Sequence, residues 1–376
     1  MTYEELKIEA AKYPDRMTDF ERITAYGRGE EVDHIPMTLS IGENQATWYG
    51  YTLSEFRNDP QVQVDVDRRA MEDFGCGTIK ARTLLYPPAV GKAFGSQFAS
   101  PKNGGEYITE HILKDYSQLD ELHFDPYTSP GLAEKLSNAK EIIAITEGKC
   151  RVMCSVVGPL SGALGIREPG LLMRDIKKNP QQLHRLLSIV VDSQLQWLEC
   201  NLKEFGKIGL TIFDPASSGD MISPAVYREF VKPHMQDMLK GIKERYGRIP
   251  SMGVMGDTRG IWNDLAEMGV PSFLVDGEID LAELKNAVGD RMAIAGNVPP
   301  VEVMLRGSID DVIEAVKQSL IKGSDNPCGY TLSIGGPPPK GIPKENMEAY
   351  LYAGRRYGRG AKKGQLCKGL IEKGLI

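Results

Sequence analysis

Hydrophobic and polar positions repeat in one recurring unit along the chain from about residue 151 onward. Each unit has a short apolar segment, a turn rich in Gly, Pro or Asp, and a longer segment with apolar positions at helical spacing. This alternation is typical of parallel strands joined by helical crossovers, because parallel neighbours need a long connection. The predicted strands cover residues 152–157, 208–213, 249–254, 272–275, 292–295 and 330–334, and the predicted helices cover about 179–205, 224–246, 259–268, 281–287, 308–321 and 344–357.

The part of the chain before residue 151 is less regular. Thr18 and Glu21 form a capping-box pattern that predicts a helix start, and Pro60 predicts the first turn of another helix that ends at Gly75. Two further strands are predicted at residues 37–40 and 77–81, and residues 89–114 have the alternation and the Gly104-centred turn of a β-hairpin.

These two strands bring the total to about eight, the number at which alternating strands and helices close into a (β/α)8 TIM barrel. We therefore predict an α/β fold with three parts: an N-terminal helical extension at residues 1–33, a barrel at 34–360 with a hairpin insertion at about 89–114, and a basic C-terminal tail at 361–376. The alternative is an open doubly wound sheet, which would carry a Gly-rich phosphate turn if it bound nucleotide. The chain has no GxGxxG or GxxxxGK[ST] motif.

Charge and composition exclude several classes of function. Lys and Arg number 45 against 51 Asp and Glu, a net charge of −6, which argues against binding to nucleic acid. The six cysteines form no CxxC pair, the N-terminus is too polar for a signal peptide, and no apolar run is long enough to span a membrane. We expect a reduced, cytoplasmic protein with no membrane or nucleic-acid partner.

Candidate catalytic residues follow from the barrel prediction, because reactive groups lie at the carboxyl ends of barrel strands. Asp214 and Asp276 each end an apolar strand, and Glu278 follows shortly after. With Asp257, which also fits the role of a helix cap, they are expected to face one cavity. Crowded carboxylates raise one another's pKa, so this group suits general-acid work or cation binding. Other residues expected at this end and considered for substrate binding are Ser40, Glu43, Asn44, Arg82 and Asn297.

The five histidines form no HExxH, HxH or HxC pattern, so no conventional zinc site is predicted from spacing.

Six short motifs in the second half of the chain occur in a recognisable order. They begin at Gly158-Pro159, Arg174-Asp175, Phe213-Asp214-Pro215, Met255-Gly256-Asp257, Gly296-Asn297-Val298-Pro299 and Pro343-Lys344-Glu345-Asn346. In this order they resemble the uroporphyrinogen decarboxylase superfamily. The resemblance implies a (β/α)8 barrel and an enzyme from one of two branches: decarboxylases, or methyltransferases that work with corrinoid proteins.

Differences from the family patterns narrow the choice of branch. The decarboxylases carry an arginine-containing N-terminal segment that binds a porphyrinogen, whereas the equivalent strand end here has Glu43 and no arginine. Burying substrate carboxylates without arginine partners is costly. Methyltransferases that act on thiols carry a His-x-Cys-Gly motif and a later cysteine that bind zinc, and this chain has Met255 and Gly336 at the two cysteine positions.

The remaining branch predicts a methyltransferase that moves a methyl group from a methoxylated aromatic compound to the Co(I) corrinoid of a partner protein. Asp214, Asp276 and Glu278 would polarise the ether oxygen, directly or through a cation. The expected walls for the ring are Met252 and Met255, with Trp48 and Tyr49 from the first loop. Whether the protein binds zinc as a cofactor stays open. The resemblance suggests Glu199, Asp214 and His234 as ligands, but the flanking-helix positions of Glu199 and His234 argue against their convergence.

Three alternatives stay open: a decarboxylase of a small acid, a methylcorrinoid:thiol methyltransferase, and a non-catalytic barrel that serves as a scaffold. The basic segment 355–363 suits an acidic corrinoid protein as partner, although a frayed tail explains it as well. A homodimer also stays open.

Overall fold

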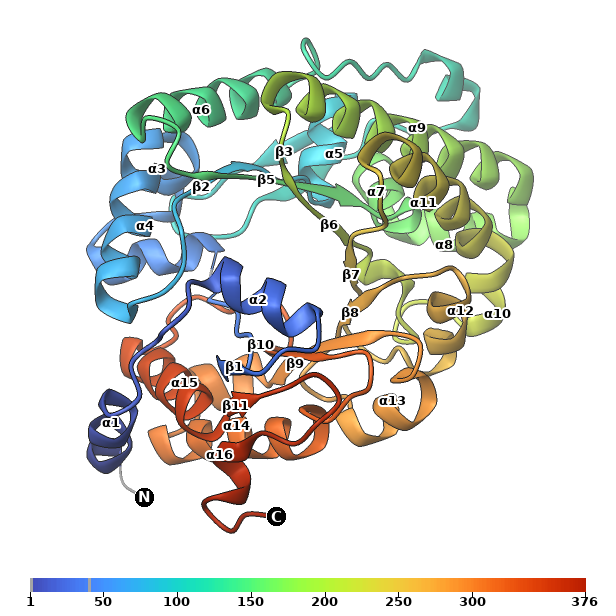
Figure 1. Ribbon diagram of the computed structural model, residues 1–376. Helices are drawn as coiled ribbons and strands as arrows, with labels where there is room; N and C mark the ends of the chain where they lie inside the picture. The colour runs from blue at the N-terminus through green and yellow to red at the C-terminus, as the bar shows by residue number, and fades with distance from the viewer. Residues whose placement is uncertain (1–2, 40–41) are drawn as a thin grey trace.

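A parallel sheet of seven strands forms the centre of the computed structural model, which describes residues 3–39 and 42–376. The helices form a ring around it (Figure 1). The strand order is β10-β9-β8-β7-β6-β5-β2, so every neighbour follows the chain order expected for strand–helix repeats. The strands are β2 (Lys80–Thr83), β5 (Arg151–Val157), β6 (Gly209–Phe213), β7 (Ser251–Gly253), β8 (Ser272–Leu274), β9 (Ala293–Val298) and β10 (Tyr330–Ile334).

The predicted strand at residues 37–40 is reduced to an isolated parallel bridge between Met37 and Leu332 of β10. Ser40 lies outside the described residues. Within residues 3–39 and 42–376, no ladder joins this segment to β2. The fold is therefore a seven-stranded parallel α/β sheet with one bridging segment, and closure into an eight-stranded barrel is not observed.

The helices pack their apolar faces on the sheet, and local sequence explains where they begin and end. In α4 (Pro60–Phe74), the Asp59 side chain accepts hydrogen bonds from the first-turn N–H groups, and Gly75 ends the helix with φ of 64°. The other helices around the sheet are α3 (Leu53–Asn58), α6 (Leu132–Ile145), α7 (Pro159–Ile166), α8 (Pro169–Lys178), α9 (Pro180–Phe205), α10 (Pro224–Val226), α11 (Lys232–Tyr246), α12 (Trp262–Glu267), α13 (Leu281–Val288), α14 (Ile309–Gly323) and α15 (Lys344–Tyr357).

The two ends of the chain meet at the amino ends of the strands. The predicted capping box of Thr18 and Glu21 is present at the start of α2 (Asp19–Gly27), and the Tyr26 hydroxyl accepts a hydrogen bond from Tyr330 N at the start of β10. Strand β1 (Val32–His34) pairs antiparallel with β11 (Arg359–Ala361). In Figure 1, α2 lies across the middle of the ring. The remaining terminal helices are α1 (Tyr3–Ala11) and α16 (Lys368–Ile371).

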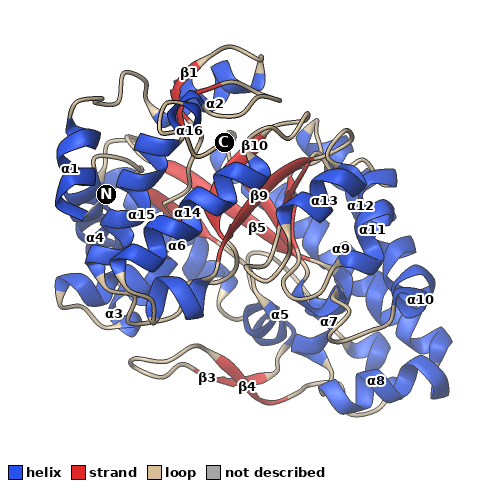
Figure 2. Cartoon of the chain, turned by 90° about the horizontal axis from the view of Figure 1, so that it is seen from below, coloured by secondary structure: helices blue, strands red, loops and turns tan. Residues whose placement is uncertain are grey.

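The predicted hairpin lies on the opposite side of the sheet from α2 (Figure 2). It consists of β3 (Gln97–Ala99) and β4 (Tyr107–Glu110), paired antiparallel. Its predicted bounds of about 89–114 were too wide, because residues 89–94 belong to α5 (Pro87–Phe94). Because α2 lies at the amino ends of the strands, the hairpin lies at their carboxyl ends.

Two short helical segments also contribute to the site: η1 (Gly42–Tyr49) and η3 (Pro215–Ser217).

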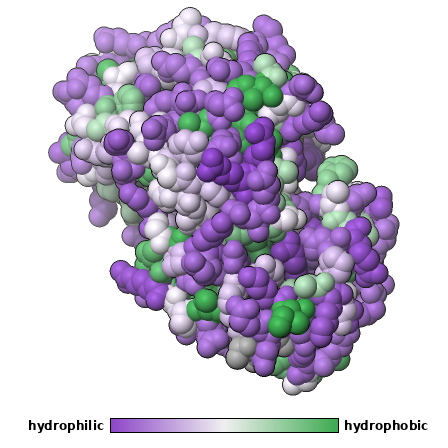
Figure 3. All heavy atoms as spheres, turned by 90° about the vertical axis from the view of Figure 1, so that its left-hand side faces the viewer, coloured by the Kyte–Doolittle hydropathy of each residue, from purple (hydrophilic) through white to green (hydrophobic). Residues whose placement is uncertain are grey.

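Apolar side chains are gathered inside the molecule. On the face that Figure 3 shows, hydrophobic residues are scattered among hydrophilic ones and form no single large patch. In the described part of the chain, no helix is both long and apolar enough to cross a lipid bilayer.

Candidate active site

A cavity of about 470 Å³ opens at the carboxyl end of β2. It lies between η1, α3, α5, α6 and the β3–β4 hairpin, and its volume falls in the range of roughly 300–1,000 Å³ that is typical of small-molecule sites. Three aromatic side chains line it: Phe56 from α3, Tyr86 from the loop after β2, and Phe98 from the hairpin. Such walls suit a flat apolar ligand.

Two arginines in the cavity form ion pairs with carboxylates of the same chain. Arg57 forms two contacts of 2.6 Å with Glu43 and also donates to the Gly104 carbonyl in the hairpin. Arg82 donates to Asp67 at 2.7 Å and lies over the Phe56 ring. Glu43 and Arg82, both predicted to bind substrate, therefore do line the cavity, but each already has a partner of opposite charge.

Lys135 differs from these arginines. Its ammonium lies 5.2 Å from the centre of the Tyr86 ring, and it forms no hydrogen bond or ion pair with any described residue. Burial lowers the pKa of Lys135 below its usual value, and nearby Lys92 lowers it further, while Glu106 and Glu43 act in the opposite direction.

The Tyr86 hydroxyl donates a hydrogen bond to Glu106. Burial raises the pKa of Tyr86, and the negative charge of Glu106 raises it further. The phenol therefore stays protonated at neutral pH. Together, Tyr86 and Glu106 hold one proton at the wall of the cavity.

Gln63, from α4, supplies a polar group without a partner. It lines the cavity with only 6% of its surface exposed, and its Oε1 atom accepts no hydrogen bond from the described residues. Buried acceptors of this kind are rare unless a ligand or water completes them.

Asp214 lies outside this cavity and is completely buried. Its carboxylate accepts hydrogen bonds from Ser161 N, at the start of α7, and from the Ser217 hydroxyl. Burial raises the pKa of Asp214, and these two hydrogen bonds oppose the rise. The backbone approaches so closely that a Cβ atom at Gly158 would lie 2.1 Å from Asp214 Cγ. This geometry is that of an internal cap for α7.

Asp276 and its neighbours form a rigid corner after β8. Asp276 accepts hydrogen bonds from Gly256 N and Glu278 N, both at 3.1 Å, and Glu278 itself is exposed. The Asn297 amide donates to the carbonyls of Asp276 and Ile279. None of the four predicted carboxylates lines the 470 Å³ cavity.

Met255 and Gly336, the two positions where the thiol-type pattern has cysteines, lie side by side in this corner. A Cβ atom at Gly336 would lie 3.6 Å from Met255 Sδ and 4.0 Å from Asp276 Oδ2. The alignment of these positions from sequence therefore agrees with their geometry. A thioether and a missing side chain cannot supply the two thiolates of that pattern.

The residues predicted from the first loop fasten it to the loop after β10 and to α4. Asn44 donates to the Pro338 carbonyl at 2.6 Å, Trp48 donates to the Ile342 carbonyl at 2.8 Å, and Tyr49 donates to Asp73 at 2.6 Å. Neither aromatic side chain lines the cavity, and Met252 is buried in β7.

The suggested zinc trio has separate partners. Glu199 is exposed and pairs with Arg245, Asp214 binds the start of α7, and His234 lies 3.0 Å from His184. The expectation that these residues do not converge agrees with this arrangement. They offer no common set of ligands.

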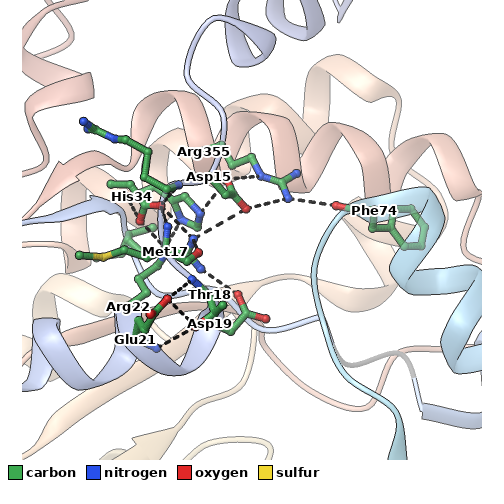
Figure 4. Close-up of polar contacts among 12 residues, drawn as sticks. Asp15, Met17, Thr18, Asp19, Glu21, Arg22, His34, Phe74 and Arg355 are labelled. Atoms are coloured by element: carbon green, nitrogen blue, oxygen red, sulfur yellow. Dashed lines mark hydrogen bonds and ion pairs between the residues drawn. The ribbon is translucent and has the colours of Figure 1, made fainter. Parts of the chain in front are cut away.

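One group among the described residues brings three possible metal-ligating side chains within 4.8 Å: Asp15, Asp33 and His34. Figure 4 shows how arginines surround it. Arg22 binds Asp33 at 2.7 Å, and Arg355 binds Asp15 at 3.0 Å. Because these arginines already neutralise both carboxylates, the group is an ion network that fastens the N-terminal segment to α15.

The basic C-terminal segment is largely engaged within the chain. Arg355 contacts Asp15, Arg356 contacts Glu9 at 2.6 Å, and Arg359 contacts Glu372.

Comparison with known proteins gives one family and one fold. The family model described as uroporphyrinogen decarboxylase (URO-D) matches residues 18–357. A uroporphyrinogen decarboxylase from Xanthomonas campestris pv. campestris (strain B100) is 33% identical over 319 residues, covering 80% of this chain and 86% of that protein. One from Dechloromonas aromatica (strain RCB) is 26% identical over 310 residues, covering 80% and 84%. A methyltransferase from Methanosarcina mazei shares the fold with a TM-score of 0.74 and 20% identity, over 90% of this chain and 98% of that one.

Proposed function

Because the chain belongs to the uroporphyrinogen decarboxylase family, whose members are enzymes, we propose that it is the methyl-transferring component of an O-demethylase. It would take a methyl group from a methoxylated aromatic compound and pass it to the Co(I) corrinoid of a partner protein. The observation that carries the proposal is the aromatic-walled cavity of about 470 Å³ with a proton held at its wall.

The cavity residues would bind and orient the aromatic ring. Phe56 and Phe98 offer ring faces and edges, and the Arg57–Glu43 pair, which also binds the Gly104 carbonyl, holds the hairpin over the site. A ring bound under the hairpin would displace water from the cavity, which strengthens the polar contacts within the site. A bound ring would therefore be held with its methoxy group in a dry and fixed position.

The proposed reaction is a displacement at the methyl carbon. The corrinoid of the partner protein supplies the nucleophile. The bond between methyl carbon and ether oxygen breaks, and its electron pair stays on the oxygen. Tyr86 would donate a hydrogen bond to that oxygen and so stabilise the negative charge that develops on it, and the phenolate product takes up a proton from water after release. This assignment replaces the predicted acids, because Asp214 has no exposed surface and Asp276 already accepts two backbone hydrogen bonds.

The residues of the corner after β8 do not fit a zinc ion. The corner at Met255, Gly336 and Asp276 has one carboxylate and no thiolate or imidazole, so it does not match a tetrahedral zinc site. The same comparison argues against a thiol as the methyl acceptor at this position.

The test is incubation of the protein with a reduced corrinoid protein and methoxybenzoates or other methoxyarenes. We expect the spectrum of methyl-Co(III) to appear together with one equivalent of phenol. Tyr86→Phe should lower kcat by about a hundred- to a thousandfold with a small change in KM. Tyr107→Phe is the control, because it removes the hydroxyl of an exposed tyrosine in the β3–β4 hairpin that does not line the cavity. An unchanged kcat in Tyr86→Phe would refute the role of Tyr86, and no methyl transfer from any methoxyarene would refute the function.

The second candidate is a decarboxylase of a small acid. The names of the two relatives favour it, and the unpaired Lys135 is compatible with an acidic substrate. Both cavity arginines are already paired with acids of the chain, so a porphyrinogen with many carboxylates finds few free partners. This candidate predicts release of carbon dioxide in the absence of any corrinoid protein.

A further inference from the structure

Lys135 is a cation in the cavity that has no acidic partner among the described residues. Lys135 lies in the first turn of α6, where its ammonium contacts the face of Tyr86. A lysine ammonium in a partly dry site is unfavourable unless a negative charge lies next to it. Keeping this charge inside the cavity therefore lowers the stability of the folded protein.

The acidic groups around Lys135 are engaged elsewhere. Glu106 accepts the hydrogen bond of Tyr86, and Glu43 is held by Arg57. Glu134 is largely exposed and lies 3.8 Å from Lys92, the other lysine at the cavity. None of these carboxylates forms an ion pair with Lys135 in the described structure.

Two further features face the same cavity. Gly131, at the N-cap position of helix α6, lines the cavity and has no side chain to cap the helix, so the positive end of the helix dipole adds to the charge of Lys135. The buried Gln63 Oε1 atom lacks a donor among the described residues. The site thus offers a positive region for an anion, next to a buried polar side chain.

We propose that Lys135 binds a carboxylate of the substrate, so that the enzyme selects methoxylated aromatic acids over uncharged methoxyarenes. The inference rests on the proposed function for the identity of the ring, and it assigns Lys135 as the residue that determines specificity. The charge balance permits one carboxylate, because Lys135 is the cavity cation without an acidic partner among the described residues.

The experiment measures binding by calorimetry, without any corrinoid protein. The probes are para-methoxybenzoate and its uncharged methyl ester, which share the ring and the ether. The purified protein should bind the acid about ten- to a hundredfold more tightly than the ester, the range expected of a hydrogen bond to a charged group. Lys135→Met should abolish this preference by weakening the acid alone, and Lys135→Arg should retain part of it.

Lys140 supplies the matched control on the same helix, because it is exposed and lies outside the cavity. Lys140→Met should keep the full preference for the acid. Thermal unfolding of each variant checks that it is folded. An equal preference in Lys135→Met and in the unmodified protein overturns the inference, and so does an ester that binds as tightly as the acid.

The pH dependence gives a second readout. Because the pKa of Lys135 is lowered, its ammonium loses its proton at a lower pH than an exposed lysine does. The preference for the acid should therefore decline as the pH rises through that value, while binding of the ester stays level. Glu106, Glu43, Glu134, Lys92 and Tyr86 surround Lys135, and Lys135→Met removes the decline only if Lys135 is the group that titrates.

Failure of the inference and failure of the proposed function give different results. Selective binding of the acid without methyl transfer refutes the function and supports the role of Lys135. Methyl transfer from acids and neutral ethers at equal rates supports the function and refutes the role of Lys135.

Discussion

Two clusters of charged side chains lie at opposite ends of the sheet, and they differ in how completely their charges are matched. At the amino end, buried Arg22 contacts three carboxylates, those of Asp15, Asp19 and Asp33. At the carboxyl end, Lys135 faces a cavity and has no partner among the described residues. Both clusters combine basic side chains with acids, and a cavity borders each of them. The second cluster differs in that one of its cations, Lys135, has no acidic partner among the described residues.

The difference separates a structural role from a binding role. A polar network whose arginines and carboxylates are paired holds parts of the chain together, and here it joins the N-terminal segment to α15. A group that stays unmatched in a cavity costs stability and is typical of a functional site. Pairing, and not the mere presence of charge, is thus the better guide to the active site.

Removing the centre of the matched cluster should have the largest effect. Arg22→Met leaves three carboxylates close together without their shared cation, and breaking a buried ion pair from one side costs about 3–5 kcal/mol. Arg28→Met, which removes an exposed arginine that pairs with Glu30, is the control and should cost less than about 1 kcal/mol. Urea unfolding measures both. Similar midpoints for the two variants would show that the cluster contributes little to stability.

Acid should weaken the same cluster. Burial alone would raise the pKa of Asp33, but its hydrogen bonds with Arg22 and Arg16 N lower it to about 2. Because the folded-state pKa lies below the unfolded value, the contribution is complete above about pH 5 and is lost as the pH falls toward 2. We expect Asp33 to account for about 2 kcal/mol of this loss. Asp33→Asn should flatten the dependence of the urea midpoint on pH in this range, and an unchanged slope would contradict the assignment.

The repeating units of the sheet could be predicted from sequence because they depend on local periodicity. The capping box of Thr18 and Glu21 and the helix between Asp59 and Gly75 formed as expected, since nearby residues alone determine them. The strand at 37–40 was overestimated. A run of apolar residues indicates strand propensity, but pairing along its whole length depends on distant neighbours, and only Met37 bridges to β10.

The cavity could be predicted only in part. The rule that active groups follow the strands led to Glu43 and Arg82, which do line it. Lys135 and Gln63 come from the helices α6 and α4, and they meet only through the packing of the fold. Tyr86 follows β2 directly, so the same rule applied to its whole loop would have included it. The rule also proposed Asp214, because position after a strand does not show whether a side chain faces a cavity or an internal helix end.

Removing the unmatched charge should produce a smaller effect of opposite sign. Lys135→Met keeps the length of the side chain and relieves the cost of a partly buried ammonium, so it should raise the free energy of unfolding by roughly 1 kcal/mol. Lys140→Met again serves as the control, because it removes an ammonium that is exposed and not buried. A destabilised Lys135→Met protein would mean that the ammonium has a structural partner, and the contrast between the two clusters would fail.

Asp214 gives the finest test, because it lies at the carboxyl end of the sheet but is matched like the cluster at the amino end. In Asp214→Asn the amide oxygen can still accept from Ser161 N, and the amide group can donate to Ser217 Oγ. We therefore expect kcat within about threefold and stability within about 1 kcal/mol of the unmodified protein.

Asp214→Ala removes the cap of α7, so it should lower the free energy of unfolding by about 1–3 kcal/mol while kcat of the folded protein stays nearly unchanged. If Asp214→Asn instead loses more than about a hundredfold in kcat while its urea midpoint is unchanged, a matched and fully buried carboxylate takes part in catalysis. The pairing of charges would then no longer distinguish structural from functional groups in this fold.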